Sequence, residues 1–287
     1  MLLASSGEVV ALGETVHLWE RGVLKDERCS CGEPFSRCPF WSMVGDVAFG
    51  GWSRSLADEV LRLKHQVDRT RYVPLTLNAA PESRRGCAVE RYAKFYVDIY
   101  RAVQEEVGGA WVLDSSKHVS LAAALAVAGG ADLQILHVVR DPRAVAYSWS
   151  QTIGRPEAGH RAVMAKAHPA RIAARWTTQN ALFSLVRRRA PVYRVRYEDF
   201  AVNPADVLTR LRRLLDLPEV VDVTTSGDSW ARFEMHSVSG NPMRFAAGPI
   251  TVTIDNAWRS GLSTRDRYVV QALTAPLVHA YRAKDDS

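Results

Sequence analysis

A short apolar run that ends in Arg-Asp-Pro constrains the fold of this chain more than any other feature. The run opens residues 133–149, whose sequence is Leu-Gln-Ile-Leu-His-Val-Val-Arg-Asp-Pro-Arg-Ala-Val-Ala-Tyr-Ser-Trp. Its apolar and β-branched first half is typical of a fully buried parallel strand. Pro142 suits the first turn of a following helix, and Asp141 suits its N-cap. The pattern therefore predicts an α/β fold built around a strand, a turn and a helix.

This strand and helix carry two polar residues that could hold a ligand. Arg140 ends the predicted strand, and Ser148 lies on the predicted helix. Ligands of open α/β sheets bind at this strand-to-helix edge. A guanidinium and a hydroxyl beside a helix suit a phosphate group. The alternative is that Asp141 and Arg143 simply cap and decorate the helix.

The composition is that of an ordinary soluble globular protein. Of the 287 residues, 47% are apolar and 24% are charged, and the formal net charge is +6. Such a charge suits nucleic acid, a membrane surface or a polyanionic nucleotide. Several arginines lie on predicted helices rather than in one block, so we expect no nucleic-acid partner. No apolar run is long enough for a membrane span, and the first ten residues form no convincing signal peptide.

The residues around Arg140 resemble a known nucleotide-binding segment. Arg140, Asp141, Pro142, Ser148 and Trp149 resemble the 3′-phosphate-binding segment of sulfotransferases that use 3′-phosphoadenosine 5′-phosphosulfate (PAPS), in particular the bacterial carbohydrate and tyrosylprotein-like branch. The resemblance implies one domain over residues 1–287 with a three-layer α/β/α fold like that of P-loop NTPases and a mainly parallel sheet. It also implies PAPS as co-substrate and adenosine 3′,5′-bisphosphate as product.

The same resemblance implies roles for further residues that would bind the nucleotide. Arg140 and Ser148 would hold the 3′-phosphate. Tyr197, in the Tyr-Glu-Asp run that follows a predicted strand, would contact the adenine. Arg244 would supply a further 3′-phosphate contact from a mobile lid loop over residues 225–260, where a plain surface loop is the alternative.

Three residues are candidates for the chemistry of sulfuryl transfer. Glu14 follows Gly13 in a segment that resembles the one in which family members carry a proposed general base. Lys117 lies in the Asp-Ser-Ser-Lys-His turn after a predicted strand, where it would neutralise charge on the leaving group. His118 in the same turn is the second candidate for the base, because cytosolic sulfotransferases use a histidine from a comparable turn. The alternatives are a surface or capping role for Glu14 and a helix N-cap in the turn that carries Lys117. His17 is a weaker candidate base.

One element of the family pattern is absent from the printed sequence. Sulfotransferases begin with a strand and a Gly-x-x-Arg-Ser-Gly-Thr-Thr type of loop that holds the 5′-phosphosulfate, and no such loop occurs here. We expect either a start codon assigned too late, which is the favoured explanation, or a degenerate member of the family. In either case the chain as written is expected to be impaired in catalysis.

The cysteines allow two interpretations. Cys29, Cys31 and Cys38 lie in a Cys- and aromatic-rich insert over residues 20–55. They could bind zinc with His17 or Cys87 as the fourth ligand, but packed free thiols are the favoured interpretation. No metal is expected to be needed for the chemistry. Four cysteines do not force disulfides in a chain of this length, so a cytoplasmic location is expected.

The sequence thus predicts a sulfotransferase that moves a sulfuryl group from PAPS to a hydroxyl or amine. Small-molecule, saccharide or lipid acceptors all fit, and the oligomeric state stays open. Two alternatives remain: a non-catalytic nucleotide-binding or scaffold protein, and a nucleotide-dependent phosphoryl transferase, which needs its own phosphate loop and Mg²⁺.

Overall fold

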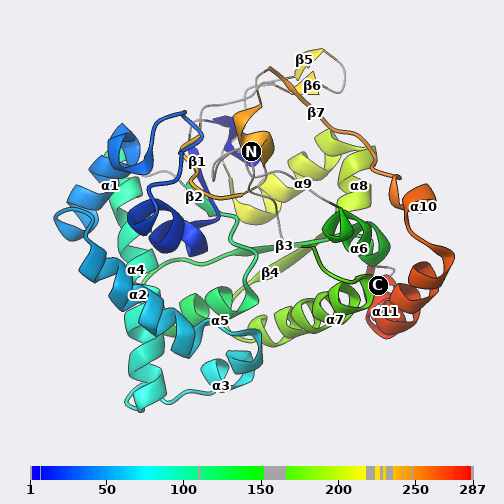
Figure 1. Cartoon of the computed structure of the whole chain (residues 1–287), viewed down its shortest axis with the longest axis horizontal. Helices are drawn as coiled ribbons and strands as arrows, with labels where there is room; N and C mark the ends of the chain where they lie inside the picture. Colours follow the sequence, from blue (N-terminus) through cyan, green and yellow to red (C-terminus); the bar gives the residue numbers. More distant parts are fainter. Residues whose placement is uncertain are drawn as a thin grey trace.

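Two pairs of parallel strands organise the computed structural model of the chain (Figure 1). The structure describes residues 2–6, 8–108, 111–151, 166–217, 224–226, 229–230, 235–240, 242–246 and 248–285. Strand β1 (Val9–Gly13) pairs with β2 (Trp111–Asp114), and β3 (Ile135–Val139) pairs with β4 (Val192–Arg196). The predicted α/β class with parallel strands is confirmed, and the strands are short and pair in twos.

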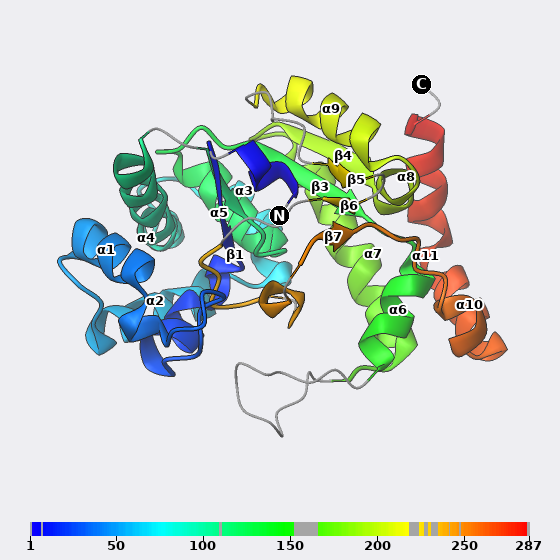
Figure 2. The ribbon, with the colours of Figure 1, turned by 90° about the horizontal axis from the view of Figure 1, so that it is seen from above.

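Helices cover these strands on both sides. The helices are α1 (Pro39–Phe49), α2 (Arg54–Val67), α3 (Val73–Leu77), α4 (Arg84–Val107), α5 (Val119–Ala128), α6 (Pro142–Ser150), α7 (Pro169–Val186), α8 (Tyr197–Val202), α9 (Pro204–Leu215), α10 (Trp258–Gly261) and α11 (Thr264–Asp285). Figure 2 shows α9 and α7 on opposite sides of the β3–β4 pair. This arrangement has the predicted three layers, helix on strands on helix.

The side-chain alternation of β3 and β4 explains this layering. Ile135 and Val192 pack with α5 and α7, whereas Leu136 and Val195 pack with α9. Neighbouring residues of a strand point to opposite faces, so both faces of the pair need a cover. Val138 nevertheless keeps 53% of its surface exposed. The predicted fully buried strand is therefore only partly buried, because a pair of strands is too narrow to be covered along its whole length.

The turn after β3 forms as its sequence predicts. Asp141 is the N-cap of α6, and its carboxylate accepts a hydrogen bond of 2.8 Å from the backbone N–H of Arg143. Pro142 occupies the first helical position, where its missing N–H costs nothing. The cap fixes the direction in which the chain leaves the carboxyl end of β3, next to Arg140.

The segment over residues 20–55 contributes to the largest core rather than forming a separate unit. It contains a π-helix (Leu18–Leu24), a 3₁₀ helix (Phe35–Arg37) and α1. Trp19 and Trp41 are fully buried there, and the ring centroid of Trp19 lies 5.5 Å from that of Trp52. These aromatic rings pack with α2 and α4, so the segment is anchored firmly beside β1.

The region predicted as a lid loop contains regular structure. Within its described residues lie the short antiparallel strands β5 (Thr224–Ser226), β6 (Ser229–Trp230) and β7 (Ile250–Thr251) and a 3₁₀ helix (Pro242–Phe245). These elements are only two to four residues long, and the prediction of a mobile lid over residues 225–260 stays a prediction. In the parts of the chain that the structure describes, no helix combines the length and apolar character that a membrane span requires.

Acid is expected to destabilise the fold because His137 is buried in its neutral form. Burial lowers the pKa of His137 to about 4, although its hydrogen bond to Asn180 opposes the shift. The unfolded histidine binds a proton near pH 6.5, so this contribution to stability is present above that pH and is lost as the pH falls toward 4. The loss at pH 5 is about 2 kcal/mol. His137→Gln should flatten the fall in unfolding free energy between pH 7 and 5, measured by urea titration, and an unchanged slope would contradict this account.

Candidate active site

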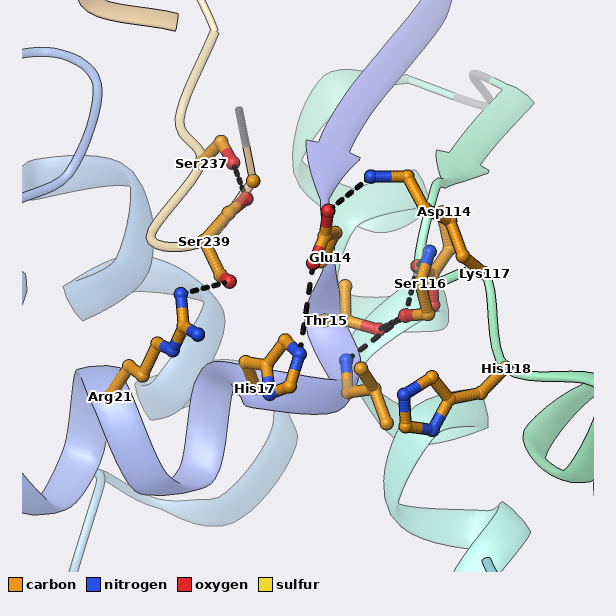
Figure 3. Close-up of polar contacts among 12 residues, drawn as sticks. Glu14, Thr15, His17, Arg21, Asp114, Ser116, Lys117, His118, Ser237 and Ser239 are labelled. Atoms are coloured by element: carbon orange, nitrogen blue, oxygen red, sulfur yellow. Dashed lines mark hydrogen bonds and ion pairs between the residues drawn. The ribbon is translucent and has the colours of Figure 1, made fainter. Parts of the chain in front are cut away.

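The predicted catalytic residues lie in two loops that leave neighbouring strands. Because β1 and β2 are parallel, Gly13 is paired with Asp114 at their carboxyl ends. Glu14 follows β1, and the turn with Lys117 and His118 follows β2. Figure 3 shows these side chains close to one another between the two loops. The carboxyl edge of the strands thus brings together residues about one hundred positions apart in the chain.

Glu14 and Lys117 form an ion pair across the two loops. The Lys117 ammonium donates a hydrogen bond to Oε1 of Glu14, whose side chain is only 14% exposed. Lys117 has a backbone φ of +62°, in the left-handed region that a lysine rarely adopts. Such a conformation costs free energy and occurs often at functional sites. The turn therefore accepts backbone strain at the residue that carries the ammonium group.

Asp114 holds both loops in place. Its Oδ2 accepts hydrogen bonds from Thr15 and from the Tyr100 hydroxyl, the latter 2.6 Å long. Its Oδ1 accepts from the backbone N–H of Ser116 at 2.8 Å. The Ser116 hydroxyl in turn accepts from the backbone N–H of Val16 at 3.0 Å. One carboxylate therefore fixes the residues beside Glu14 and those just before Lys117.

His118 is oriented by a buried carboxylate. Its Nδ1 lies 3.1 Å from Oδ2 of Asp68, whose side chain is completely buried. Asp68 also accepts hydrogen bonds from Ser120 and from the Tyr92 hydroxyl. Burial alone would raise the pKa of Asp68, but the hydrogen bond and charge of His118 and the bond from Ser120 outweigh it, so this pKa is lowered. With Nδ1 turned to a carboxylate, Nε2 of His118 is the nitrogen left to accept a proton.

His17 separates the two candidate bases. Its Nε2 lies 3.7 Å from Oε2 of Glu14, and its ring centroid lies 5.9 Å from that of His118. Burial, followed by the positive charges of Lys64 and Arg21, lowers the pKa of His17 to about 3. His17 is therefore neutral at neutral pH and adds no charge between Glu14 and His118.

The predicted nucleotide-binding residues Arg140 and Tyr197 meet at the edge of the other strand pair. The guanidinium of Arg140 lies 4.7 Å from the centroid of the Tyr197 ring, and its Nη2 donates a 2.6 Å hydrogen bond to Asp255. A cavity of about 330 Å³ opens beside Arg140, lined also by Arg194 and Arg196. A smaller one of about 60 Å³ lies between Arg140, Tyr197 and Asp255. Arg140 thus keeps open space beside it although a carboxylate holds it.

Two predicted nucleotide-binding residues do not join this pair. Ser148 lies on α6 near its end and lines neither cavity beside Arg140. Arg244 is buried, donates through Nη1 to the carbonyl oxygen of Gly240 at 3.4 Å, and lies over the Phe245 ring. Gly240 belongs to the segment beside Glu14, so Arg244, in the 3₁₀ helix Pro242–Phe245, contacts the end of that segment rather than Arg140.

Comparison with known proteins identifies the family. A family model described as the sulfotransferase family matches residues 45–222, more than half of the chain. The chain belongs to the sulfotransferase family. No curated protein matches it. A solved structure described as the sulfotransferase domain from the curacin biosynthetic pathway is 16% identical, with a TM-score of 0.41, over 73% of this chain and 77% of that domain.

The stretch that matches the family model, residues 45–222, contains some of the candidate residues and excludes others. It contains Lys117, His118, Arg140, Ser148 and Tyr197, whereas Glu14 and Arg244 lie outside it. The family match therefore covers the first five residues, whereas Glu14 and Arg244 are candidates on other grounds.

Two carboxylates in this sulfotransferase were missed by sequence reasoning. Asp68 directly follows α2, and Asp255 lies in an irregular segment before α10. Neither residue belongs to a motif. Asp68 is 50 positions from His118 in the sequence, and Asp255 is 115 positions from Arg140, so only folding brings each pair together. The one local signal is that Asp68 directly follows the strongly amphipathic helix α2, and this position does not predict a contact with His118.

Proposed function

We propose that this sulfotransferase moves a sulfuryl group from PAPS to a hydroxyl, or an amine, of a small-molecule, saccharide or lipid acceptor. The observation that carries the proposal is a cation and an oriented base in adjacent residues of one turn, Lys117 and His118, with Asp68 behind the imidazole. Transfer of an anionic group from a phosphate leaving group needs both a cation and a base.

The proposed reaction is an in-line displacement at sulfur. The acceptor oxygen attacks the sulfur and forms the new S–O bond while its proton passes to Nε2 of His118. The bond from sulfur to the bridging oxygen breaks, and that oxygen leaves on the 5′-phosphate of adenosine 3′,5′-bisphosphate with the electron pair. Lys117 neutralises the charge that develops on this oxygen. Asp68 stabilises the imidazolium that results.

In this proposal Glu14 positions Lys117 rather than acting as the base. Sequence reasoning ranks Glu14 first, but its Oε1 already accepts a hydrogen bond from the Lys117 ammonium, and its Oε2 lies 3.7 Å from Nε2 of His17. His118 is placed differently, since Asp68 holds its Nδ1 and leaves Nε2 as the nitrogen that can accept the proton. The geometry therefore favours His118, and Glu14 remains the second candidate.

The donor would bind with its adenine and 3′-phosphate near Tyr197 and Arg140. Tyr197 offers an aromatic face, and Arg140 offers a guanidinium that, among the residues the structure describes, is ion-paired with the exposed loop carboxylate of Asp255. A dianionic 3′-phosphate would displace Asp255, because charge-assisted bonds from a guanidinium to phosphate are strong. Ser148 and Arg244 stay predicted 3′-phosphate contacts, although neither lines the two cavities beside Arg140. The free cysteines are consistent with the proposed cytoplasmic location.

Nucleotide binding provides the test of this function. Adenosine 3′,5′-bisphosphate should raise the thermal unfolding midpoint more than ATP does, with or without Mg²⁺. Arg140→Ala is expected to weaken bisphosphate binding by about 10- to 100-fold, measured by isothermal titration calorimetry, because it removes a charge-assisted hydrogen bond.

A matched pair of variants sharpens this test. Asp255→Asn is expected to strengthen bisphosphate binding, because it removes the carboxylate that competes for Arg140. Arg62→Ala removes an exposed guanidinium of α2 and should leave the affinity unchanged. Tighter binding of ATP with Mg²⁺ than of the bisphosphate would favour the phosphoryl transferase instead.

A further inference from the structure

The local fold around the first two cysteines turns both thiols to one side. Arg28 and Pro34 form an antiparallel bridge, and the backbone N–H of Cys29 donates to the carbonyl oxygen of Glu33 at 2.9 Å. Gly32 has a φ of +95°, a conformation that glycine adopts without strain. The Cys29-Ser30-Cys31-Gly32 sequence therefore forms a tight turn that presents two sulfur atoms together.

A third thiol comes from the start of α1. The 3₁₀ helix Phe35–Arg37 leads directly into Cys38, which is the N-cap of α1. Its Sγ lies 3.6 Å from that of Cys31. The positive end of a helix favours the thiolate form of a cysteine there. Cys29 and Cys38 are fully buried, and Cys31 is half-buried.

The fourth group comes from almost two hundred residues further along the chain. Nδ1 of His236 lies 3.3 Å from Sγ of Cys38 and 3.8 Å from Sγ of Cys29. The imidazole is stacked on the Phe40 ring, with centroids 4.7 Å apart and an angle of 8° between the planes. Ser30 and Ser237 exchange two hydrogen bonds of 2.9 and 2.8 Å. These contacts fix the orientation of the His236 ring toward the three sulfur atoms.

The spacing of the four groups is that of a tetrahedral zinc site. The three sulfur atoms and the nitrogen all lie within 4.8 Å of one another. With Zn–S near 2.3 Å and Zn–N near 2.0 Å, a tetrahedron separates two sulfurs by about 3.8 Å and sulfur from nitrogen by about 3.6 Å. The Cys31–Cys38 sulfur distance of 3.6 Å and the His236 nitrogen–sulfur distances of 3.3 and 3.8 Å scatter around these values. A disulfide would bring two sulfurs much closer and leave the other ligands without a role.

We propose that Cys29, Cys31, Cys38 and His236 bind one structural Zn²⁺ ion. Three thiolates and an imidazole suit zinc, and four protein ligands leave no open position for substrate or water. This assignment replaces the two fourth ligands suggested by sequence. His17 lies beside Glu14, and Cys87 is an exposed residue of α4 whose thiol faces the carbonyl oxygen of Pro81.

The ion would fasten residues 235–240 beside the candidate active site. From His236 the segment runs past Gly13, where an added Cβ would lie only 1.9 Å from the Ser237 hydroxyl. The carbonyl oxygen of Ser239 accepts from the backbone N–H of Glu14 at 3.3 Å, and its hydroxyl accepts from Arg21 at 2.9 Å (Figure 3). Zinc would therefore hold this segment against the loop that carries Glu14. The site rests on the four ligands alone and does not depend on the proposed function.

Metal analysis of the purified full chain tests the proposal. Protein prepared with a reducing agent and without chelators should contain one zinc per chain by inductively coupled plasma mass spectrometry. Replacement of zinc by Co²⁺ should give the intense visible bands of tetrahedral cobalt together with thiolate-to-cobalt charge transfer. Removal of zinc should lower the thermal unfolding midpoint by roughly 5 °C or more, because metal binding contributes to folding free energy.

Variants identify the ligands. Cys31→Ser and Cys38→Ser should lose most of the zinc, and His236→Ala should also lose it. His236→Cys should restore it, because a fourth thiolate also suits zinc. Cys87→Ser is the matched control and should keep one zinc per chain. The proposal is overturned by a wild-type chain that binds neither zinc nor tetrahedral Co²⁺, by iron in place of zinc, by a disulfide among these cysteines, or by zinc that survives all three ligand losses.

Discussion

Replacing His118 with alanine is expected to lower the turnover rate kcat by about 10²- to 10⁴-fold, the usual contribution of a general base. The affinity for adenosine 3′,5′-bisphosphate should stay within about twofold, because His118 takes part in proton transfer and not in holding the nucleotide. The measurement is transfer of radiolabelled sulfuryl groups from PAPS to an acceptor found by screening. His65→Ala removes an exposed imidazole of α2 and should have no effect on the rate.

Two further variants separate His118 from Glu14 as the base. Asp68→Asn keeps the size of the side chain but removes the charge beside Nδ1. It should lower kcat, because an amide at this position no longer fixes the tautomer and orientation of the imidazole ring through Nδ1. Glu14→Gln should lower the rate less than His118→Ala does, because in this proposal Glu14 only positions Lys117. A larger loss in Glu14→Gln than in His118→Ala would make Glu14 the base.

Local chemistry made the strand-to-helix unit around Arg140 predictable. The apolar run, the capping Asp141 and the first-turn Pro142 act over a few residues, and the structure forms β3 and α6 with this cap. The parallel pairing follows from the same pattern, and it brings Glu14 next to Lys117 and Arg140 next to Tyr197. Contacts between strand ends could thus be anticipated without knowing the packing of the helices.

Contacts made by irregular segments were beyond sequence reasoning. His236 joins the three cysteines, and Asp255 joins Arg140, each from a stretch with no strong helix or strand pattern. Nothing in the local sequence says where such a stretch lies, because its path is set by long-range hydrogen bonds such as those between Ser30 and Ser237. The cysteine spacing allowed a zinc site as an alternative to packed free thiols, and only the folded chain brings His236 to these cysteines.

Replacing Asp114 with alanine is expected to lower the free energy of unfolding by about 3 kcal/mol, because several buried or half-buried donors lose their acceptor at once. Thr15 and Ser116, which both donate to this carboxylate, are buried, and the Tyr100 hydroxyl donates to it from α4. Asp114→Asn keeps one acceptor oxygen and should cost about half as much. Urea unfolding followed by circular dichroism measures both values.

A partly buried carboxylate of α4, Asp98, gives the matched control for Asp114. Asp98 pairs with Lys94 one helical turn away, and such a surface pair contributes at most about 0.5 kcal/mol. Asp98→Ala should therefore change stability little. Asp114→Ala should also lower kcat in conditions where the variant is fully folded, since Ser116 directly precedes the strained Lys117. If Asp114→Ala loses no more stability than Asp98→Ala, the carboxylate does not hold the two loops together, and the positions of Lys117 and His118 must be fixed by Asp68 and the helix that follows them.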